Sequence, residues 1–164
     1  MIKSLPYEAT GKAIKGYENS VIAKYETNDC VVRAFASSFE IPYDEAHSIV
    51  ATKFNRQNRK GTYGTSSTLV KISNEKVVIN EKKVYIVGKS SLTMSGSLKY
   101  DVKVKGVIVK REMTVGRFVK ENPTGCFFVI VKGHAFTIKN GVVIGNYEDS
   151  QKLKTRLKCA FEIK

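Results

Sequence analysis

The sequence has few of the residues that build metal sites and disulfide frameworks. Its 164 residues include no tryptophan, two histidines and three cysteines, which are Cys30, Cys126 and Cys159. Three scattered cysteines are too few for a disulfide framework, and such usage fits the reducing cytoplasm. The cysteines and the two histidines, His47 and His134, also lack the paired spacing of zinc ligands. We therefore expect no metal and no other cofactor.

Long apolar runs are missing as well. No segment is apolar over the roughly 20 residues that a helix needs to cross a bilayer. The first residues, 1–14, lack the apolar block of a secretory signal. Hydrophobic residues make up 42% of the chain and charged residues 26%, which is typical of a globular protein. We expect a single domain over residues 1–164, located in the cytoplasm and without a membrane partner.

Acidic residues are scarce relative to basic ones. The chain has 15 Asp and Glu against 28 Lys and Arg, so its formal net charge is +13. A surface of this charge attracts a polyanion such as nucleic acid or an acidic protein. Many lysines fall in segment 76–111, where runs at 77–79, 84–87 and 102–105 are strand-like. We expect a lysine-rich β insertion there, whose lysines protect strand edges from aggregation rather than line a binding groove.

Helical spacing dominates the first half of the chain. Val31, Ala34, Phe35 and Phe39 recur at helical intervals, which predicts a buried amphipathic helix from about residue 30, with Asn28 and Asp29 as caps. A second helix is expected from Pro42, with an apolar stripe that includes His47; packing alone explains that histidine. A polar loop, 61–67, precedes a third short helix through residue 72.

The second half of the chain predicts strands. A short helix over 114–123 is followed by strand-like segments at 126–131, 134–138 and 142–144, separated by Lys132-Gly133 and Asn140-Gly141 turns. Residues 90–97 read as a polar loop. The tail, 152–164, fits an edge strand or a short helix, and residues 1–26 fit at most one short element. The fold class expected is α+β, with N-terminal helices packed on an antiparallel sheet.

Cys30 is the residue with the clearest chemical potential. In the first turn of a helix, unpaired N–H groups and the helix dipole favour a thiolate. A buried structural cysteine is the alternative. His134 begins a strand directly after a glycine, and Asn146 and Asp149 come just past the next strand. A thiolate, an imidazole and a group that orients the ring are what cysteine-based acyl transfer requires.

This order of residues resembles the papain-like cysteine peptidase superfamily. The resemblance is closest to small phage and bacterial proteins that carry an Asn-Asp-Cys-Val-Val-Arg-Ala block, here residues 28–34. The matching features that follow are Tyr43 to His47, Gly61-Thr62, Gly133-His134 and Gly141. The resemblance covers roughly residues 27–72 and 114–148 and leaves the lysine-rich segment unmatched. It implies a papain-like fold in which the Cys helix precedes a His-bearing sheet.

The resemblance also implies roles for individual residues. Cys30 is the expected nucleophile and His134 the base, with Asn146 or Asp149 as the third member. Papain-like enzymes usually place a glutamine about six residues before the cysteine, where this chain has Lys24. The oxyanion donors are therefore expected to be the N–H of Cys30 with Asn28 or Asn19.

Three functions follow from these residues. The first is a thiol hydrolase that cleaves a peptide or isopeptide bond in a peptide or protein substrate, in the host cytoplasm if the protein is phage-encoded. The second is a catalytically weak or inactive scaffold that binds nucleic acid or an acidic host protein through its basic surface. The third is acyl transfer to an amine by the same residues.

Overall fold

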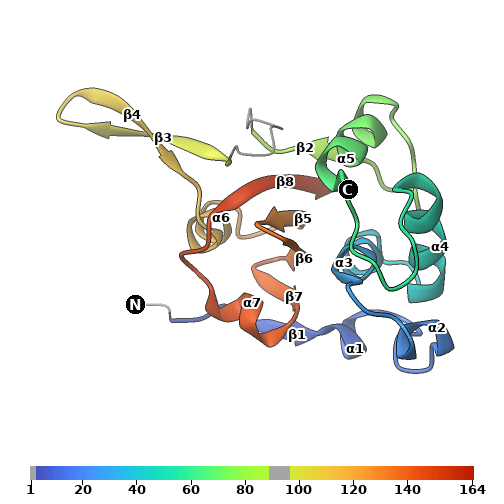
Figure 1. Ribbon diagram of the computed structural model, residues 1–164. Helices are drawn as coiled ribbons and strands as arrows, with labels where there is room; N and C mark the ends of the chain where they lie inside the picture. The colour runs from blue at the N-terminus through green and yellow to red at the C-terminus, as the bar shows by residue number, and fades with distance from the viewer. Residues whose placement is uncertain (1–2, 89–96) are drawn as a thin grey trace.

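A computed structural model describes residues 3–88 and 97–164 of the chain (Figure 1). The fold is α+β, as expected, with a six-stranded sheet and several helices. The helices are α1 (Thr10–Ala13), α2 (Val21–Lys24), α3 (Cys30–Phe39), α4 (Tyr43–Lys53), α5 (Thr65–Asn74), α6 (Val115–Glu121) and α7 (Tyr147–Gln151). The strands are β1 (Tyr7–Ala9), β2 (Val84–Ile86), β3 (Lys99–Val104), β4 (Val107–Glu112), β5 (Cys126–Val131), β6 (His134–Lys139), β7 (Val142–Gly145) and β8 (Leu157–Ile163).

The main sheet has the order β1-β7-β6-β5-β8-β2. Strand β1 runs parallel to β7, whereas the other neighbours are antiparallel, so the sheet is mixed rather than purely antiparallel. Strands β3 and β4 form a separate two-stranded ribbon. This ribbon extends away from the body of the molecule (Figure 1).

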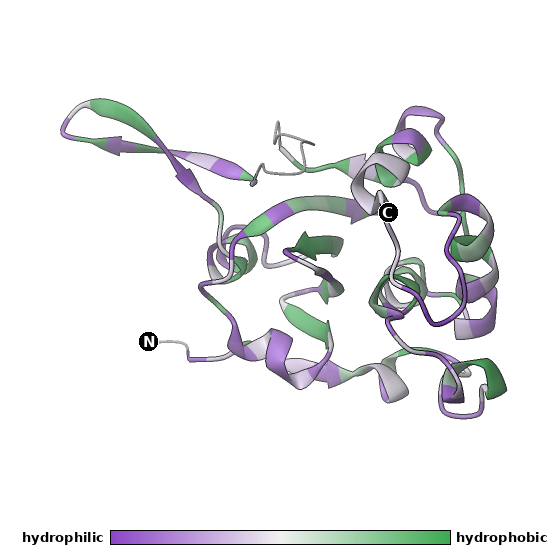
Figure 2. Cartoon of the chain, viewed as in Figure 1, coloured by the Kyte–Doolittle hydropathy of each residue, from purple (hydrophilic) through white to green (hydrophobic). Residues whose placement is uncertain are grey.

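The central strands of the sheet are covered on both faces, and β5 is accordingly almost continuously apolar. Successive side chains of a strand point to opposite faces. Accordingly, Phe128 packs with Phe35 and Phe39 of α3, whereas Phe127 packs with Phe118 of α6. Helices α3, α4 and α5 lie on one side of the sheet and α6 on the other (Figures 1 and 2).

A buried hydroxyl joins α3 to the sheet. Thr137 of β6, fully buried, donates a hydrogen bond to the carbonyl oxygen of Ala34 at 2.9 Å and shares a second one of 2.6 Å with Ser37. These bonds leave α3 little freedom to shift along β6, because a buried polar group that lost its partner would destabilise the fold. The helix is therefore held at one position along β6, and this position sets the geometry of its first turn.

The helices expected from about residue 30, from Pro42 and within 114–123 are present as α3, α4 and α6. The third helix is α5, which begins at Thr65. The residue at its N-cap is Gly64, which is left-handed with φ +64°, so no side chain caps this helix. The strands expected at 126–131, 134–138 and 142–144 are β5, β6 and β7. Local patterns were sufficient for these elements because α3 has a clear apolar face, α6 begins at a capping threonine, and glycine turns separate the three strands.

Other expectations need correction. Segment 77–79 is not a strand: only Ile79 forms an isolated bridge, to Lys82. The insertion expected over 76–111 is divided, since β2 joins the main sheet and only β3 and β4 stand apart. The tail forms β8, an inner strand between β5 and β2 rather than an edge strand or helix. The polar loop expected at 90–97 lies, apart from its last residue, outside the described residues.

Candidate active site

Cys30 is the first residue of α3. The chain enters the helix through Asn28, whose φ of +53° turns the backbone, and Asp29 at the N-cap. The buried carboxylate of Asp29 does not cap the helix. It accepts a hydrogen bond of 2.8 Å from the Tyr43 hydroxyl and lies 3.1 Å from Nε of Arg33. Asp29 therefore anchors the start of α3 to α4 and leaves the first N–H groups of the helix facing the site.

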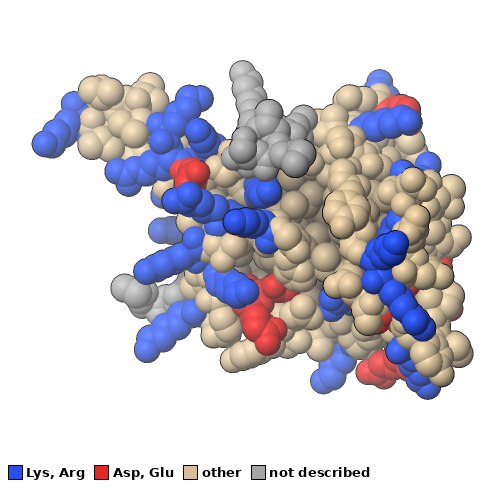
Figure 3. Space-filling model, viewed as in Figure 1, with Lys and Arg blue, Asp and Glu red and all other residues tan. Residues whose placement is uncertain are grey.

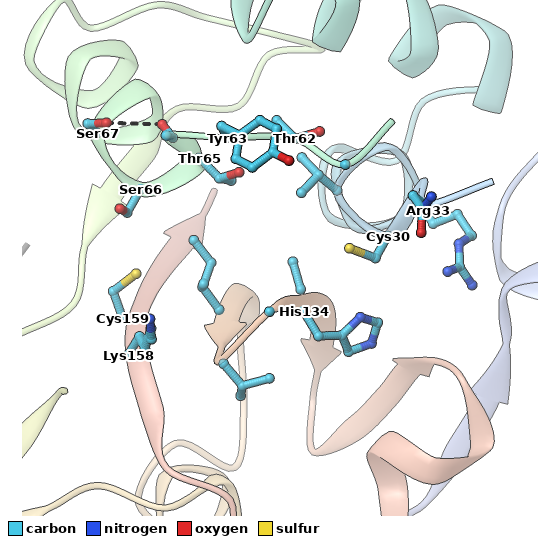
Figure 4. Close-up of a pocket in the computed structure, with 18 of the residues that line it drawn as sticks. Cys30, Arg33, Thr62, Tyr63, Thr65, Ser66, Ser67, His134, Lys158 and Cys159 are labelled. Atoms are coloured by element: carbon cyan, nitrogen blue, oxygen red, sulfur yellow. Dashed lines mark hydrogen bonds between the residues drawn. The ribbon is translucent and has the colours of Figure 1, made fainter. Parts of the chain in front are cut away.

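His134 is the first residue of β6 and follows Gly133, which turns the chain with φ +68°. Its imidazole and the backbone N–H of Ala135 lie close enough to the sulfur of Cys30 to lower the pKa of the thiol. Figure 4 shows the Cys30 side chain at the start of α3 with the imidazole of His134 beside it. The structure therefore brings together the two residues that the sequence singled out.

Asp149 of α7 holds the other side of the imidazole. Nε2 of His134 lies 3.0 Å from Oδ2 of Asp149, whose side chain is buried. The same oxygen accepts a hydrogen bond of 2.9 Å from the backbone N–H of Asn146. Because Nε2 is used by Asp149, Nδ1 is the nitrogen available to the sulfur of Cys30. The imidazole of His134 thus lies between the sulfur of Cys30 and the carboxylate of Asp149.

Asn146, the other expected third member, has a different partner. Its side-chain Oδ1 accepts a hydrogen bond of 2.9 Å from Nη1 of Arg33. The residue is exposed and precedes α7, whereas Asp149 lies one turn into that helix and points back to His134. Of the two candidates, the position that orients the imidazole is occupied by Asp149.

The ionisation of the pair is shifted toward charge separation. Burial works against ionisation of Cys30, but the hydrogen bonds from His134 and from the Ala135 N–H, together with the charges of His134 and Arg33, place the pKa of its thiol below the ordinary value. The hydrogen bond to Asp149, followed by the one to Cys30, outweighs burial and raises the pKa of His134 to about 9. The thiol of Cys30 therefore ionises at a lower pH than an ordinary cysteine, beside an imidazole that is protonated at neutral pH.

A groove of about 810 Å³ opens in front of Cys30 and His134. One wall is the loop 61–64 with the first turn of α5, and the opposite wall is built by β5, β6 and β8 (Figure 4). The residues that line it are Asn28, Cys30, Val31, Arg33, Gly61–Ser67, Ile130, Val131, Gly133–Ala135, Asn146, Lys158 and Cys159. The sulfur of Cys30 is thus accessible to a molecule of peptide size.

The expected oxyanion donors differ in their placement. Asn28 lines the groove, but its Nδ2 donates to the carbonyl oxygen of Arg59 at 3.2 Å. Asn19 is exposed in the turn before α2 and does not line the groove, and Lys24 is an exposed residue of α2. The N–H of Cys30, at the first position of a helix, has no intrahelical acceptor and remains the donor that the geometry favours.

A second network supports the segment that leads to Cys30. The Glu26 carboxylate lies 2.6 Å from Nε2 of His47 and 3.0 Å from Nη2 of Arg56, and accepts from the N–H of Arg59 at 2.5 Å. Arg56 also donates to the carbonyl oxygen of Thr27 at 3.0 Å. Burial works against the charge of Glu26, yet these partners together lower its pKa to about 2. The network ties residues 26–28 to the loop that continues into the groove wall.

Two structural limits bear on function. Within residues 3–88 and 97–164, no cluster of three or more His, Cys, Asp or Glu side chains has the arrangement of a metal site. In the same part of the chain, no helix combines the length and apolar character of a membrane span.

Several site residues gave no clear signal in the sequence. The N–H of Ala135 acts through the backbone, which a sequence pattern does not show. Arg33 belongs to the Asn-Asp-Cys block, but the sequence does not indicate its role. In the structure its charge lowers the pKa of Cys30, and its Nη1 donates a hydrogen bond to Asn146. Gly145 is required by space: a Cβ there would lie 2.7 Å from Oδ2 of Asp149 and 3.1 Å from Cβ of Phe136.

The close approach at Gly145 generates a prediction. Gly145→Ala should push the Asp149 carboxylate away from His134, because the new methyl group and Oδ2 cannot share that space. The imidazole then loses the main cause of its raised pKa, so the pKa of His134 should fall from about 9 toward 6.5. An NMR titration of the imidazole measures this shift.

Gly61→Ala is the matched control, since a Cβ at Gly61 meets nothing within 4 Å, and it should leave the titration unchanged. Asp149→Asn, which removes the charge without adding volume, should reproduce the effect of Gly145→Ala. A folded Gly145→Ala protein with an unshifted His134 would contradict the assigned geometry.

The Glu26 network predicts a pH-dependent stability difference. The folded-state pKa of Glu26, about 2, is depressed from 4.5, so its contribution to stability is complete above about pH 4.5 and lost as the pH falls toward 2. A shift of this size corresponds to about 3 kcal/mol. Urea unfolding of Glu26→Gln should therefore show a deficit of this order at pH 7 that narrows below pH 4; a deficit independent of pH would argue against the network.

A comparison with family models, with curated proteins and with solved structures found no match for this chain. The α+β architecture and the contacts among Cys30, His134 and Asp149 are therefore established from the structure of this chain alone.

Proposed function

We propose that this protein is a papain-like thiol hydrolase that cleaves a peptide or isopeptide bond in a peptide or protein substrate. The observation that carries the proposal is the juxtaposition of Cys30, His134 and Asp149 in an open groove, with the imidazole beside the sulfur and bonded to the carboxylate. A thiolate is a strong nucleophile at neutral pH only where its pKa is lowered, and the surroundings of Cys30 lower it.

The proposed reaction proceeds in two halves. The Cys30 thiolate attacks the carbonyl carbon of the substrate, and the N–H of Cys30 stabilises the resulting oxyanion. The His134 imidazolium gives its proton to the leaving amine, the C–N bond breaks and a thioester to Cys30 remains. Neutral His134 then takes a proton from water as the water attacks the thioester, and the acid is released with the thiolate restored.

Asp149 acts through His134. Its carboxylate fixes the orientation of the ring and stabilises the imidazolium that each half-reaction needs. An amine in place of water in the second half would give acyl transfer with the same residues. Hydrolysis is the reaction to test first, because water is the acceptor that is always present in an open groove.

Alkylation of the three cysteines tests the nucleophile. Burial is the main reason that the pKa of Cys126 and of Cys159 is raised to about 11. At pH 7 the thiolate is therefore only a fraction of about 10⁻⁴ of each of these two residues. Iodoacetamide should therefore modify Cys30 more than 100-fold faster than the other two well below pH 8, as peptide mapping by mass spectrometry would show. His134→Ala should slow the modification of Cys30 at least about tenfold.

Lys53→Ala is the control for removal of a cationic side chain, because Lys53 is exposed on α4 and does not line the groove. Turnover of an activated p-nitrophenyl ester tests the hydrolase itself: Cys30→Ser should reduce it to the rate without protein. Equal reactivity of Cys30, Cys126 and Cys159 would overturn the proposal.

A second candidate function is association with a polyanion, nucleic acid or an acidic protein, on the same scaffold. Basic residues gather on the β3–β4 ribbon and on the body of the molecule beside its base (Figure 3). The segments 97–121 and 152–158, called here the ribbon surface, meet where Leu157 hydrogen-bonds to Leu98 and Met113. They carry eleven Lys and Arg against three acidic residues: Lys99, Lys103, Lys105, Lys110, Arg111, Arg117, Lys120, Lys152, Lys154, Arg156 and Lys158, against Asp101, Glu112 and Glu121.

In the described part of the chain, β3 and β4 form a ribbon of their own, so their lysines lie beside the edges of this ribbon and not beside an edge of the main sheet. The ribbon also exposes apolar side chains: Val107 is 62% and Ile108 68% exposed. Exposed apolar groups beside cations are more typical of a contact surface than of a device against aggregation.

This candidate predicts binding that depends on salt. Binding can be measured by fluorescence anisotropy with duplex DNA and with polyglutamate. The affinity should fall steeply as the salt concentration rises from about 50 to about 200 mM, as is typical of binding that neutralises phosphates. The triple variant Lys103→Glu, Lys105→Glu, Lys110→Glu should abolish it, whereas Cys30→Ala should retain it. Lys53→Glu, Lys60→Glu, Lys71→Glu, with the same change of charge elsewhere, is the control; equal losses in both triples would contradict a role for the ribbon.

A further inference from the structure

The β3–β4 ribbon presents one apolar face. In an antiparallel pair, residues directly opposite each other point to the same face, and every second residue along a strand shares that face. Val104 is opposite Val107, and Val102 is opposite Val109. Figure 2 shows hydrophobic residues near the tip of the ribbon. These four valines, called here the valine face, form an apolar strip that the described part of the chain leaves unburied.

The other face of the ribbon is basic. Lys103 belongs to this face and is opposite Ile108, which carries no charge. Lys110 belongs to the same face, and Lys105 lies in the turn that joins the two strands. All three lysines are exposed. A partner on this side therefore meets positive charge along the outer half of the ribbon (Figure 3).

The acidic residues of the ribbon offset only part of this charge. Asp101 is opposite Lys110, and Glu112, at the base of the ribbon, pairs with Arg156 at 2.6 Å. Segment 99–112 contains these two acidic residues and five basic ones, which are Lys99, Lys103, Lys105, Lys110 and Arg111. The ribbon is therefore cationic as a whole, and its two faces differ sharply in character.

The edges of the ribbon are available for pairing. Within residues 3–88 and 97–164, β3 and β4 pair only with each other, and backbone hydrogen bonds join the ribbon to β8 at its base, at Leu98 and Met113. A two-stranded ribbon is marginally stable by itself, whereas three strands with an apolar face are much more stable. An unpaired strand edge can accept the backbone of another chain.

The composition of the two faces selects among the possible partners. A second copy of the chain would bring a net charge of +13 and the same lysines to this surface, which is unfavourable. Nucleic acid would contact the lysines through its phosphates and leave the valine face in water. A protein segment that alternates aliphatic and acidic residues matches both faces at once.

We propose that the ribbon binds an extended acidic segment of a partner protein as a third strand. The aliphatic side chains of the segment extend the valine face, its carboxylates lie beside the lysines of the other face, and its backbone pairs with a free edge. This inference rests on the second candidate function, association with a polyanion, and adds the class of partner and the mode of binding. It does not depend on the reaction proposed for Cys30.

Two fluorescein-labelled peptides of the same composition test the match to the two faces. One alternates glutamate and valine over about nine residues, and the other has its valines in a single block. Fluorescence anisotropy with the whole protein at low salt measures both affinities. The alternating peptide should bind at least about tenfold more tightly, because only this peptide places all its valines on one face and all its glutamates on the other.

Methylation of the peptide backbone tests strand addition directly. In a paired strand, every second residue directs its N–H and C=O groups toward the neighbouring strand. Two versions of the alternating peptide carry N-methyl groups either on the valine amides or on the glutamate amides. One version should lose binding and the other should retain it. An equal effect of the two methylations would overturn the inference, since binding by charge alone does not distinguish them.

A change of the valine face tests the protein side. The double variant Val102→Thr, Val109→Thr keeps branched side chains that favour strands and removes apolar surface, so it should weaken the alternating peptide at least about tenfold. Val21→Thr, Val78→Thr is the matched control, because both valines are exposed and lie outside the ribbon. An equal loss in the two double variants would contradict the assignment.

The other partners give different results in the same experiments. Duplex DNA that binds more tightly than the alternating peptide, with an affinity that the valine variant leaves unchanged, would assign the ribbon to nucleic acid and overturn the inference. A dimer in analytical ultracentrifugation that the valine variant dissociates would assign the valine face to a second copy and overturn it as well.

Failure of this inference can be separated from failure of the candidate function on which it rests. Equal binding of the alternating and block peptides overturns the third strand and leaves the association with a polyanion standing. Absence of binding to either peptide, to polyglutamate and to duplex DNA overturns both.

Discussion

The hydrogen bond from Thr137 to Ala34 is the contact on which the geometry of the site depends. Cys30 lies one helical turn before Ala34, and His134 lies three residues before Thr137. Fixing the helix and the strand at this point therefore also fixes how the first turn of α3 meets the first residue of β6. A slip of one residue along β6 would turn His134 to the other face of the sheet. Buried polar contacts of this kind give a core a single arrangement as well as stability.

The electrostatics of the site follow from that placement. Cys30 is buried enough for desolvation to oppose its charge, and it ionises more readily than usual because an imidazole, a backbone N–H and Arg33 surround it. The imidazole is charged because Asp149 holds its far side. Each ion is thus stabilised by the next, and the carboxylate at the end of the chain is itself held by the N–H of Asn146. Removing one member changes the pKa of the others, as is usual for coupled groups.

The sequence was informative where chemistry and local structure coincide. A cysteine at the start of an amphipathic helix and a histidine after a turn glycine are both local signals, and the structure brings Cys30 and His134 together. The choice between Asn146 and Asp149 was not local. Both residues follow β7, and only the short helix α7 turns Asp149 toward the imidazole while Asn146 reaches Arg33. No helical periodicity can be recognised in five residues.

The misassigned elements have a similar cause. The tail forms the inner strand β8 through its apolar residues. Their pattern is difficult to recognise in the sequence because the tail begins with four basic residues, Lys152, Lys154, Arg156 and Lys158. The valines at 77 and 78 suggested a strand, but within residues 3–88 and 97–164 no strand pairs with them. Strand formation depends on a partner elsewhere in the chain, and local composition does not contain that information.

Ala34 and Thr137, joined in the folded protein, are 103 residues apart in the chain. Contacts between such distant segments form late, because the entropy of closing a long loop is lost before the contact compensates for it. Until they form, Cys30 has no imidazole beside it and behaves like any thiol of an unfolded polypeptide. The lowered pKa of the thiol is thus acquired only with tertiary structure, so the rate at which Cys30 is alkylated can serve as a reporter of the native state.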